Sequence, residues 1–219
     1  MKKFKNTFYM IAAGLAIFVS TENADAQNYR RGCANKSLIA GIPKSDISEE
    51  EKEGLILMRE EEKLARDVYV TLAGQWNIPV FSNISRSEQM HMDAVKALLD
   101  RYGLEDPVKD DRTGVFTSPK LAELYKSLVE KGSNSLMDAL EVGATIEDLD
   151  IKDLDELITK TDNQDIIVTY KNLTKGSRNH MRAFSRQITN RGGSYNPQFI
   201  SMGEYNTILN TPHERGYIE

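Results

Sequence analysis

Apolar side chains recur every three or four residues along much of the chain, which is the spacing of helices that bury one face. The clearest stripe predicts a helix over residues 49–75, because Ser48 and Glu51 form a capping box at its start. The apolar positions of this stripe are Leu55, Met58, Leu64, Ala65, Val68 and Leu72. The pattern therefore predicts a long first helix with one face turned to a core.

A second helix is predicted over residues 79–102 by a similar apolar stripe. The connection that follows, residues 103–117, carries Gly, Pro and Asp with few apolar positions, so it predicts a long loop. Ser118 and Pro119 then open a short helix that is predicted to end at Gly132. The remaining helices are predicted over residues 135–159, 163–190 and 202–209.

Capping residues and connection lengths predict how these helices are arranged. Ser135 with Asp138 fits the start of the third long helix, and Asp162 with Asp165 fits the start of the fourth. No stretch alternates apolar and polar side chains as a strand does, so the predicted fold class is all-α. Four long helices with one long connection between the second and third are the outline of a four-helix bundle with a crossover.

The first 26 residues have the three-part pattern of a signal peptide. Three lysines precede the apolar run 8–19, and Ala24-Asp25-Ala26 supplies a cleavage site of small residues. The run is too short to span a bilayer comfortably, and no second run of that length follows. We expect an exported protein, periplasmic or secreted, with no membrane attachment after cleavage. The alternative is a buried N-terminal helix or an uncleaved anchor.

Charge and cysteine content narrow the classes of protein. Removing residues 1–26 takes away three of the 28 basic and two of the 33 acidic residues, leaving 25 and 31 and a net charge of −6. This charge argues against nucleic acid as a partner. Cys33 is the single cysteine, so it is either a bystander thiol or forms an intermolecular disulfide. After the signal peptide we expect a flexible leader (27–47), a helical bundle (48–192) and a C-terminal extension with a short helix (193–219).

The first chemical signal is Glu88, followed three residues later by His91 on the predicted second helix. Residues three apart share a helix face, so this carboxylate and imidazole can reach one metal ion. The alternative is that Ser85 and Glu88 form a capping box, although a helix start at Pro79 argues against it. Glu-x-x-His is also the repeating element of di-iron carboxylate bundles.

The second signal is Glu62 on the first helix. Glu62 and Tyr69 lie along the apolar stripe, and a buried carboxylate is costly unless it is paired or binds a metal. The alternative is that Glu60, Glu61 and Glu62 form a solvated acidic run supported by Arg66. For Glu60 and Glu61 this solvated arrangement is the favoured interpretation.

The two helices resemble the first half of a ferritin or rubrerythrin bundle through the pattern Glu62-x-x-Ala65-x-x-x-Tyr69 followed by Phe81-x-x-Ile84-x-x-x-Glu88-x-x-His91. The resemblance covers most of residues 49–190 and is closest to an uncharacterised bacterial and archaeal branch of ferritin-like proteins. In that superfamily the first helix gives one Glu and the second gives Glu-x-x-His. The third and fourth helices repeat the scheme, so the resemblance implies a ferritin-like bundle around a metal site.

The third and fourth helices complete the match only in part. Glu147 matches the ligand position of the third helix, with Glu141 as a weaker option, and His180 matches that of the fourth. Three residues before His180 the chain has Ser177, where the superfamily usually has Glu. Two of the three histidines therefore fall at ligand positions. The metal ligands that the resemblance implies are Glu62, Glu88, His91, Glu147 and His180.

The resemblance implies an iron protein that binds two ions, or one tightly and one loosely, with manganese or zinc as alternatives for mixed oxygen and nitrogen ligands. It also implies an oxidase or peroxidase activity on dioxygen or peroxide. No catalytic residue is assigned, and Tyr69 either bonds a ligand carboxylate or only packs. The competing hypothesis is a non-catalytic binding or structural module with a vestigial or mononuclear metal site, which Ser177 favours. No ferritin-type cage is expected, and a homodimer stays open.

Overall fold

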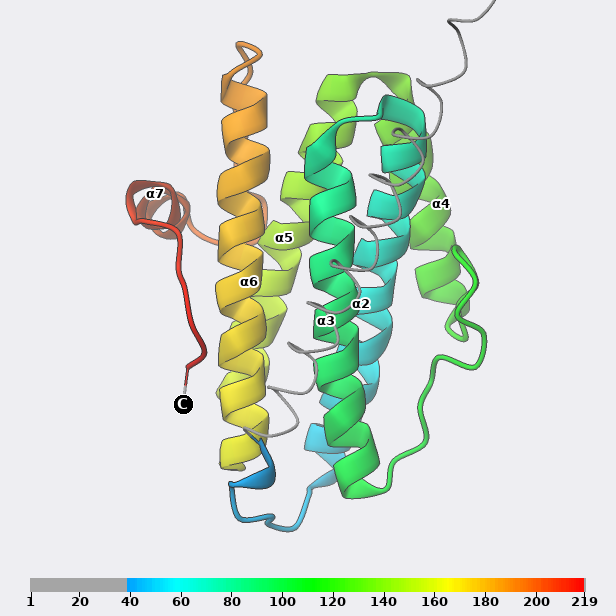
Figure 1. The fold of residues 1–219 in the computed structure, drawn as a ribbon, viewed down its shortest axis with the longest axis vertical. Coiled ribbons are helices and arrows are strands. Elements are labelled where there is room, and N and C mark those ends of the chain that lie inside the picture. Colours follow the sequence, from blue (N-terminus) through cyan, green and yellow to red (C-terminus); the bar gives the residue numbers. More distant parts are fainter. Residues whose placement is uncertain (1–38, 219) are drawn as a thin grey trace, which may run out of the picture.

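A computed structural model describes residues 39–218, which form six complete helices and no strand (Figure 1). The helices are α2 (Glu49–Trp76), α3 (Pro79–Tyr102), α4 (Pro119–Asn134), α5 (Leu136–Ile158), α6 (Gln164–Thr189) and α7 (Met202–Asn210). The predicted all-α fold class and the order of the helices are confirmed for these residues.

Four long helices stand side by side in a bundle (Figure 1). Helices α2 and α6 run in one direction, and α3 and α5 run in the opposite direction. The short turns make α2 and α3 one antiparallel pair and α5 and α6 the other. The connection from α3 to α5 is long and contains α4, which packs outside the bundle against α2 and α5.

Three of the predicted helix starts have side-chain capping hydrogen bonds in the structure. Ser48 accepts a hydrogen bond from the backbone N–H of Glu51, and the Glu51 carboxylate accepts the N–H of Ser48 in return. Ser118 and Ser135 accept backbone N–H groups at the starts of α4 and α5. Gly103 ends α3 with a φ of 72°, a left-handed conformation that suits glycine.

Two of the predicted helix boundaries are wrong. Gly132 does not end α4, because the helix continues to Asn134. A Cβ at Gly132 would lie 2.9 Å from Cδ2 of Leu72, so this glycine serves the close approach of two helices rather than a helix end. Asp162 does not cap α6, whose N-cap is Asn163. Asp165 instead accepts hydrogen bonds from the Tyr102 hydroxyl and lies 2.7 Å from Nε of Arg101.

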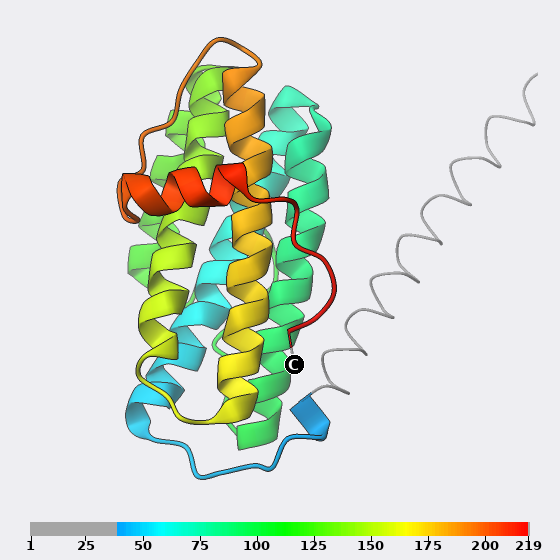
Figure 2. The same ribbon diagram turned by 90° about the vertical axis from the view of Figure 1, so that its left-hand side faces the viewer.

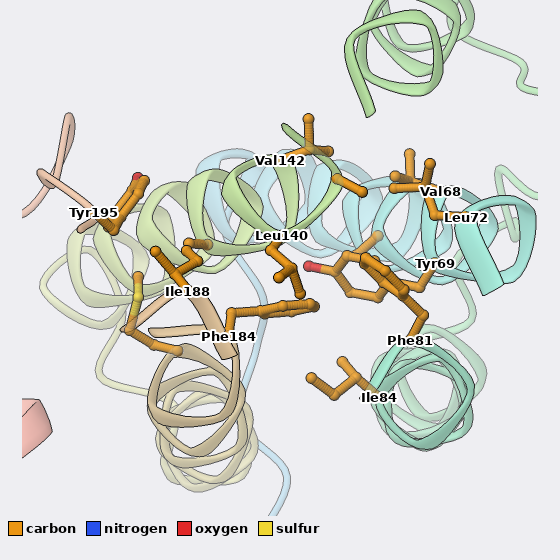
Figure 3. Close-up of a cluster of buried hydrophobic side chains, with 14 of the residues drawn as sticks. Val68, Tyr69, Leu72, Phe81, Ile84, Leu140, Val142, Phe184, Ile188 and Tyr195 are labelled. Carbon is orange, nitrogen blue, oxygen red and sulfur yellow. The ribbon is translucent and has the colours of Figure 1, made fainter. Parts of the chain in front are cut away.

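The core consists of two apolar clusters stacked along the bundle axis. The larger cluster includes Tyr69, Phe81 and Phe184, whose rings lie 5.3 to 6.3 Å apart between α2, α3 and α6 (Figure 3). The smaller cluster, which includes Leu55 and Leu98, fills the other end of the bundle. Along α2, Glu62 lies between the residues of the two clusters, so the core is interrupted by a polar layer.

The chain outside the bundle packs on its surface. Ile39 is buried against the smaller cluster, and Asn163 donates to the backbone oxygen of Asp46. Helix α7 lies across α5 and α6, and the tail after it runs along α6 (Figure 2). Every helix within residues 39–218 is either too short or too polar to span a lipid bilayer. The predicted signal peptide and Cys33 lie outside the described residues.

Candidate metal centre

Five buried side chains from the four long helices meet in the polar layer. Glu62 comes from α2, Glu147 from α5 and His180 from α6, while α3 supplies two. The five, which we call the carboxylate–histidine cluster, are Glu62, Glu88, His91, Glu147 and His180. They are the five residues predicted as ligands, and the structure brings all of them together. Their role as ligands stays a prediction.

The first half of the cluster is Glu62, Glu88 and His91. Nδ1 of His91 lies 3.1 Å from Oε2 of Glu62 and 2.8 Å from Oε2 of Glu88. On the far side of the ring, a Cβ at Gly176 of α6 would lie 2.4 Å from Nε2 of His91. The absence of a side chain at this glycine therefore lets the His91 ring stand against α6 while Nδ1 faces the carboxylates.

The second half is Glu88, Glu147 and His180. Nδ1 of His180 lies 2.8 Å from Oε1 of Glu88 and 3.3 Å from Oε2 of Glu147. The two imidazole rings are stacked with their centroids 5.4 Å apart. Glu88 thus gives one oxygen to each half, and its carboxylate lies between the two histidines.

The spacing of these atoms fits metal binding. Two ligand atoms about 2.1 Å from one ion and at right angles to each other lie about 3.0 Å apart. The distances between Nδ1 and carboxylate oxygens in both halves are 2.8 to 3.3 Å. A single proton on Nδ1 satisfies only one of two such oxygens, whereas one ion can bind all three atoms.

The charge of the cluster also fits a metal. Oε1 of Glu62 is buried and has no hydrogen-bond partner among residues 39–218. In the same part of the chain, no lysine or arginine pairs with the three glutamates of the cluster. A buried carboxylate without a cation is unfavourable, so the cluster is short of positive charge. Divalent cations would supply it.

The pKa values reflect this shortage. Burial raises the pKa of Glu62 to about 7, against the opposing effect of His91. Burial also acts to raise the pKa of Glu88, but the two imidazoles beside it lower that pKa well below its usual range. Burial disfavours the charged form of His180, yet Glu88 and Glu147 raise its pKa to about 10. In the metal-free protein the histidines thus act as the missing cations.

Tyr69 belongs to the larger apolar cluster and contacts the carboxylate–histidine cluster through its hydroxyl. Its hydroxyl donates to Oε1 of Glu147 at 2.6 Å, and burial together with the charge of Glu147 raises its pKa well above the usual value. The ring packs against Phe81 and Phe184 (Figure 3). Tyr69 therefore both packs and bonds a predicted ligand, which holds Glu147 in one orientation.

One acidic residue beside the carboxylate–histidine cluster was not predicted from the sequence. Asp150 lies three residues after Glu147 on α5 and accepts a hydrogen bond from the Ser177 hydroxyl. Burial and the charges of Glu62 and Glu147 raise its pKa well above the usual value. Its spacing from Glu147 was a partial signal, since residues three apart share a helix face, but its hydrogen bond to Ser177 crosses from α5 to α6 and is not visible in the sequence.

Three alternatives from the sequence are settled by contacts. Ser85 donates to the backbone oxygen of Ser82 inside α3, so it does not form a capping box with Glu88. The solvated acidic run is wrong for Glu60, which is buried and accepts the backbone N–H groups of Thr117 and Ser118. The weaker ligand candidate on α5, Glu141, is not part of the cluster.

The remaining parts of that acidic run differ from the prediction as well. Glu61 is half-buried, and burial with the nearby charges of Asp153 and Glu62 raises its pKa to about 8. Arg66 does not support the run, because its guanidinium bonds Asp67 and Asp111. The bond from Arg66 to Asp111 reaches the connection between α3 and α4, whose path the helix pattern alone does not predict.

Comparison with known proteins finds close relatives. Residues 51–212 match the family described as "Uncharacterized protein domain (DUF2202)", a range that includes the whole cluster. The chain is 63% identical to "Uncharacterized protein MJ0754" of Methanocaldococcus jannaschii over 178 residues, covering 81% of this chain and 96% of that protein. It is also similar to the crystal structure of hypothetical protein MJ0754 from Methanococcus jannaschii DSM 2661. That match has a TM-score of 0.78 and 63% identity, and covers 80% of this chain and 99% of the other.

Proposed function

This chain belongs to the family of the uncharacterised domain DUF2202, and we propose that it is an exported ferritin-like protein that binds two metal ions in its carboxylate–histidine cluster. The observation that carries the proposal is the position of Glu88. Its two carboxylate oxygens face Nδ1 of His91 and Nδ1 of His180, each at 2.8 Å. A carboxylate placed in this way can bridge two ions, one in each half of the cluster.

The donor atoms support iron or manganese as the metal. Three carboxylates and two imidazoles form a mixed set of hard oxygen and nitrogen ligands, and no cysteine or methionine is among them. Such a set is typical of iron and manganese, and zinc is the alternative. The direction of helices α2, α3, α5 and α6, with a crossover between the second and third, supports the ferritin-like arrangement.

Asp150 supports two ions rather than one. In the resembling superfamily a glutamate at the position of Ser177 gives the fourth carboxylate, and here the Ser177 hydroxyl bonds Asp150 of the facing helix. In our proposal Asp150 loses its proton when the ions bind and then supplies that negative charge from α5. Asp150→Asn should then lower the number of bound ions from two towards one, whereas Asp153→Asn on the same helix should leave it unchanged.

Iron held in this centre would supply the electrons for reduction of dioxygen or peroxide. The protein holds the proposed ligand side chains in position. Tyr69 holds Glu147 through its hydroxyl, and Gly176 leaves room for the His91 ring. The two apolar clusters of the core lie on either side of the carboxylate–histidine cluster along the bundle axis, so they exclude water from it in those two directions.

Oxygen consumption tests the proposed activity. The mature chain is loaded anaerobically with ferrous iron, freed of excess metal and mixed with air-saturated buffer in an oxygen electrode. We expect faster oxygen uptake than by the same amount of free ferrous iron. Glu62→Gln should lose this excess rate, and Glu141→Gln should keep it. Equal rates for protein-bound and free iron would contradict an oxidase activity.

A second candidate function is a binding or structural module with a vestigial or mononuclear site. Ser177 favours it, because a hydroxyl is a poor substitute for a bridging carboxylate. Fewer than two ions per chain, together with no oxygen uptake above that of free iron, would support this candidate. Export is tested separately by N-terminal sequencing of the protein recovered outside the cytoplasm, where a start at Gln27 is expected.

A further inference from the structure

A cavity of about 960 Å³ lies between α3 and α6 and reaches the outer edge of the metal centre. Its wall includes Asn83 and Arg86 of α3, Arg186 of α6 and His213 of the tail, and His180 of the cluster is part of it. This volume is in the range of sites that hold small organic molecules. The cavity is therefore large enough for a ligand beside His180.

The charge of this cavity is opposite to that of the whole chain. The chain has 33 acidic and 28 basic residues. Among the described residues, however, the wall contains three arginines, Arg86, Arg182 and Arg186, and no aspartate or glutamate. A neighbouring cavity of about 290 Å³ continues along the same two helices with Arg186 and Arg191, again without an acidic residue among those described. Such a wall attracts anions.

The three arginines differ in whether their guanidinium groups already have hydrogen-bond or ion-pair partners within the protein. Arg182 bonds Glu214 and the backbone oxygen of Ile208, so it holds the tail in place. Within residues 39–218 the Arg86 guanidinium hydrogen-bonds only Asn83, and the Arg186 side chain has no hydrogen-bond or ion-pair partner. Two guanidinium groups, one on each helix, are therefore available to a ligand.

His180 presents a second unused donor to the cavity. It is only 7% exposed, and its Nδ1 is turned to Glu88 and Glu147. Its Nε2 has no hydrogen-bond partner among the described residues. Histidines that bind a metal almost always donate this other ring N–H to a carboxylate, a carbonyl or water. The cavity is the place from which such an acceptor can come.

Apolar side chains share the wall with these polar groups. Ile84 and Met90 of α3, Ala183 of α6 and Leu209 of α7 line the same cavity. An inorganic anion alone would leave these side chains facing water, whereas an organic anion can cover them.

We propose that this cavity binds a small organic carboxylate, held by Arg86 and Arg186 and placed against Nε2 of His180. The ligand would be the substrate or effector of the metal centre, and this role rests on the proposed function. Binding itself does not, because the arginines and the apolar wall are present without metal. A carboxylate that accepts the Nε2 proton would make His180 a stronger electron donor to an ion at Nδ1.

Calorimetric titration of the mature chain tests the proposal, with benzoate as the organic anion, benzyl alcohol as its neutral counterpart and inorganic phosphate as the anion without an apolar body. We expect saturable binding of one benzoate per chain and at least tenfold weaker binding of the other two. The double variant Arg86→Ala/Arg186→Ala should bind benzoate at least tenfold more weakly. Arg112→Ala, an exposed arginine on the α3–α4 connection, should bind like the wild type.

Three results would overturn the proposal: no saturable benzoate binding, equal binding by the double variant, or phosphate binding as tight as that of benzoate. Contact with His180 is read separately, since benzoate should shift the Nε2 resonance of His180 in ¹⁵N-histidine-labelled, metal-free protein. An unshifted resonance would contradict this contact. Metal content is measured on the same samples. Protein that binds benzoate but no metal would support the cavity proposal and contradict the metal centre.

Discussion

On α2, Glu62 faces the interior of the bundle and the next residue, Lys63, faces the connection between α3 and α4. Both side chains are 1% exposed, and each belongs to a cluster of charged groups. We call the second group the outer ion-pair cluster and define it as Lys63, Arg66 and Asp67. The two clusters start from adjacent residues of one helix, yet they differ in charge and in hydrogen bonding.

The outer ion-pair cluster satisfies each of its charges from within the protein. Lys63 donates to Oδ2 of Asp67 at 2.5 Å and to the backbone oxygen of Arg112 at 3.0 Å. Arg66 bonds Oδ1 of Asp67 at 2.8 Å and Asp111 at 2.7 Å. The backbone N–H of Gly114 completes the shell of Asp67. Cations and carboxylates are both present, so this cluster needs no ligand.

The carboxylate–histidine cluster has the opposite composition. It contains three glutamates, with Asp150 beside them, and its only cations are protonated imidazoles. One oxygen of Glu62 has no partner in the described part of the chain. The comparison teaches that burial of charge does not by itself indicate a site. What distinguishes a candidate metal centre is buried negative charge that the protein does not balance.

The largest expected effect comes from breaking the outer ion-pair cluster. Asp67→Ala leaves Lys63 buried without its carboxylate and should destabilise the protein by about 3–5 kcal/mol. The loss should be the same with and without metal, because the cluster does not face the centre. Chemical denaturation of the metal-free and metal-loaded forms measures this loss of stability. Asp100→Ala is the control, because it removes an exposed ion pair with Lys96 and should change the stability little. A loss that disappears on metal loading would contradict the separation of the two clusters.

The second effect comes from the matching change on the inner side of α2. Glu62→Gln should lower metal affinity by at least about 100-fold, because even changes outside the ligand shell cost 10–100-fold. The metal-free protein should not be destabilised, since the raised pKa of Glu62 means that its charge is unfavourable there. Metal titration and denaturation of the same samples measure both quantities. A destabilised metal-free variant with normal metal affinity would show that Glu62 is structural.

The third effect is a pH dependence of the metal-free protein. Glu88 and Glu147 raise the pKa of His180 to about 10, although burial opposes them, so the folded state binds this proton more tightly than the unfolded state with its ordinary pKa of 6.5. The stabilisation is complete below pH 6.5 and is lost as the pH rises through 10. The melting temperature of metal-free protein should therefore be several degrees lower at pH 9 than at pH 6.

Two controls make this pH effect specific. The double variant His91→Gln/His180→Gln should lose the part of the difference that comes from the imidazoles, while Glu61, whose pKa is raised to about 8, keeps its own contribution. Metal-loaded wild type should show the opposite trend, since ions displace the Nδ1 protons and bind more tightly at higher pH. A metal-free protein that becomes more stable between pH 6 and pH 9 would contradict the assigned protonation.

The smallest effect is expected for Tyr69→Phe, which removes the hydrogen bond to Glu147. Metal affinity should fall by about tenfold, because the ligand loses the group that orients it. Tyr170→Phe is the matched control. Its hydroxyl is also buried but has no hydrogen-bond partner among residues 39–218, so its loss should change neither stability nor metal binding. Equal metal affinities in the two variants would show that Tyr69 only packs.

The sequence predicted the elements that local signals define. Helix starts at Ser48, Ser118 and Ser135 and the end at Gly103 were confirmed, because caps and left-handed glycines are decided within a few residues. Gly132 was misplaced, since a glycine at a helix crossing has the same local pattern as one at a helix end. The two cases differ only in tertiary contacts.

The same reason explains why the surroundings of two other acidic residues, Glu60 and Asp150, were not predicted. Glu60 was expected in solvent because its partners, the backbone N–H groups of Thr117 and Ser118, come from a connection whose path the helix pattern does not define. Asp150 was missed because its link to Ser177 crosses from α5 to α6. Residue spacing predicts which side chains share a face of one helix. Which residues of a second helix or of a loop lie opposite that face is known only from the structure.

The most direct test of the central claim is the number of metal ions per chain. The protein, prepared without residues 1–26, is incubated anaerobically with excess ferrous iron, freed of unbound metal by gel filtration and analysed by plasma mass spectrometry. We predict two ions per chain in the wild type and in Glu141→Gln, and close to none in Glu88→Gln, because Glu88 faces both halves of the cluster. No bound metal in the wild type, or undiminished binding by Glu88→Gln, would contradict the account.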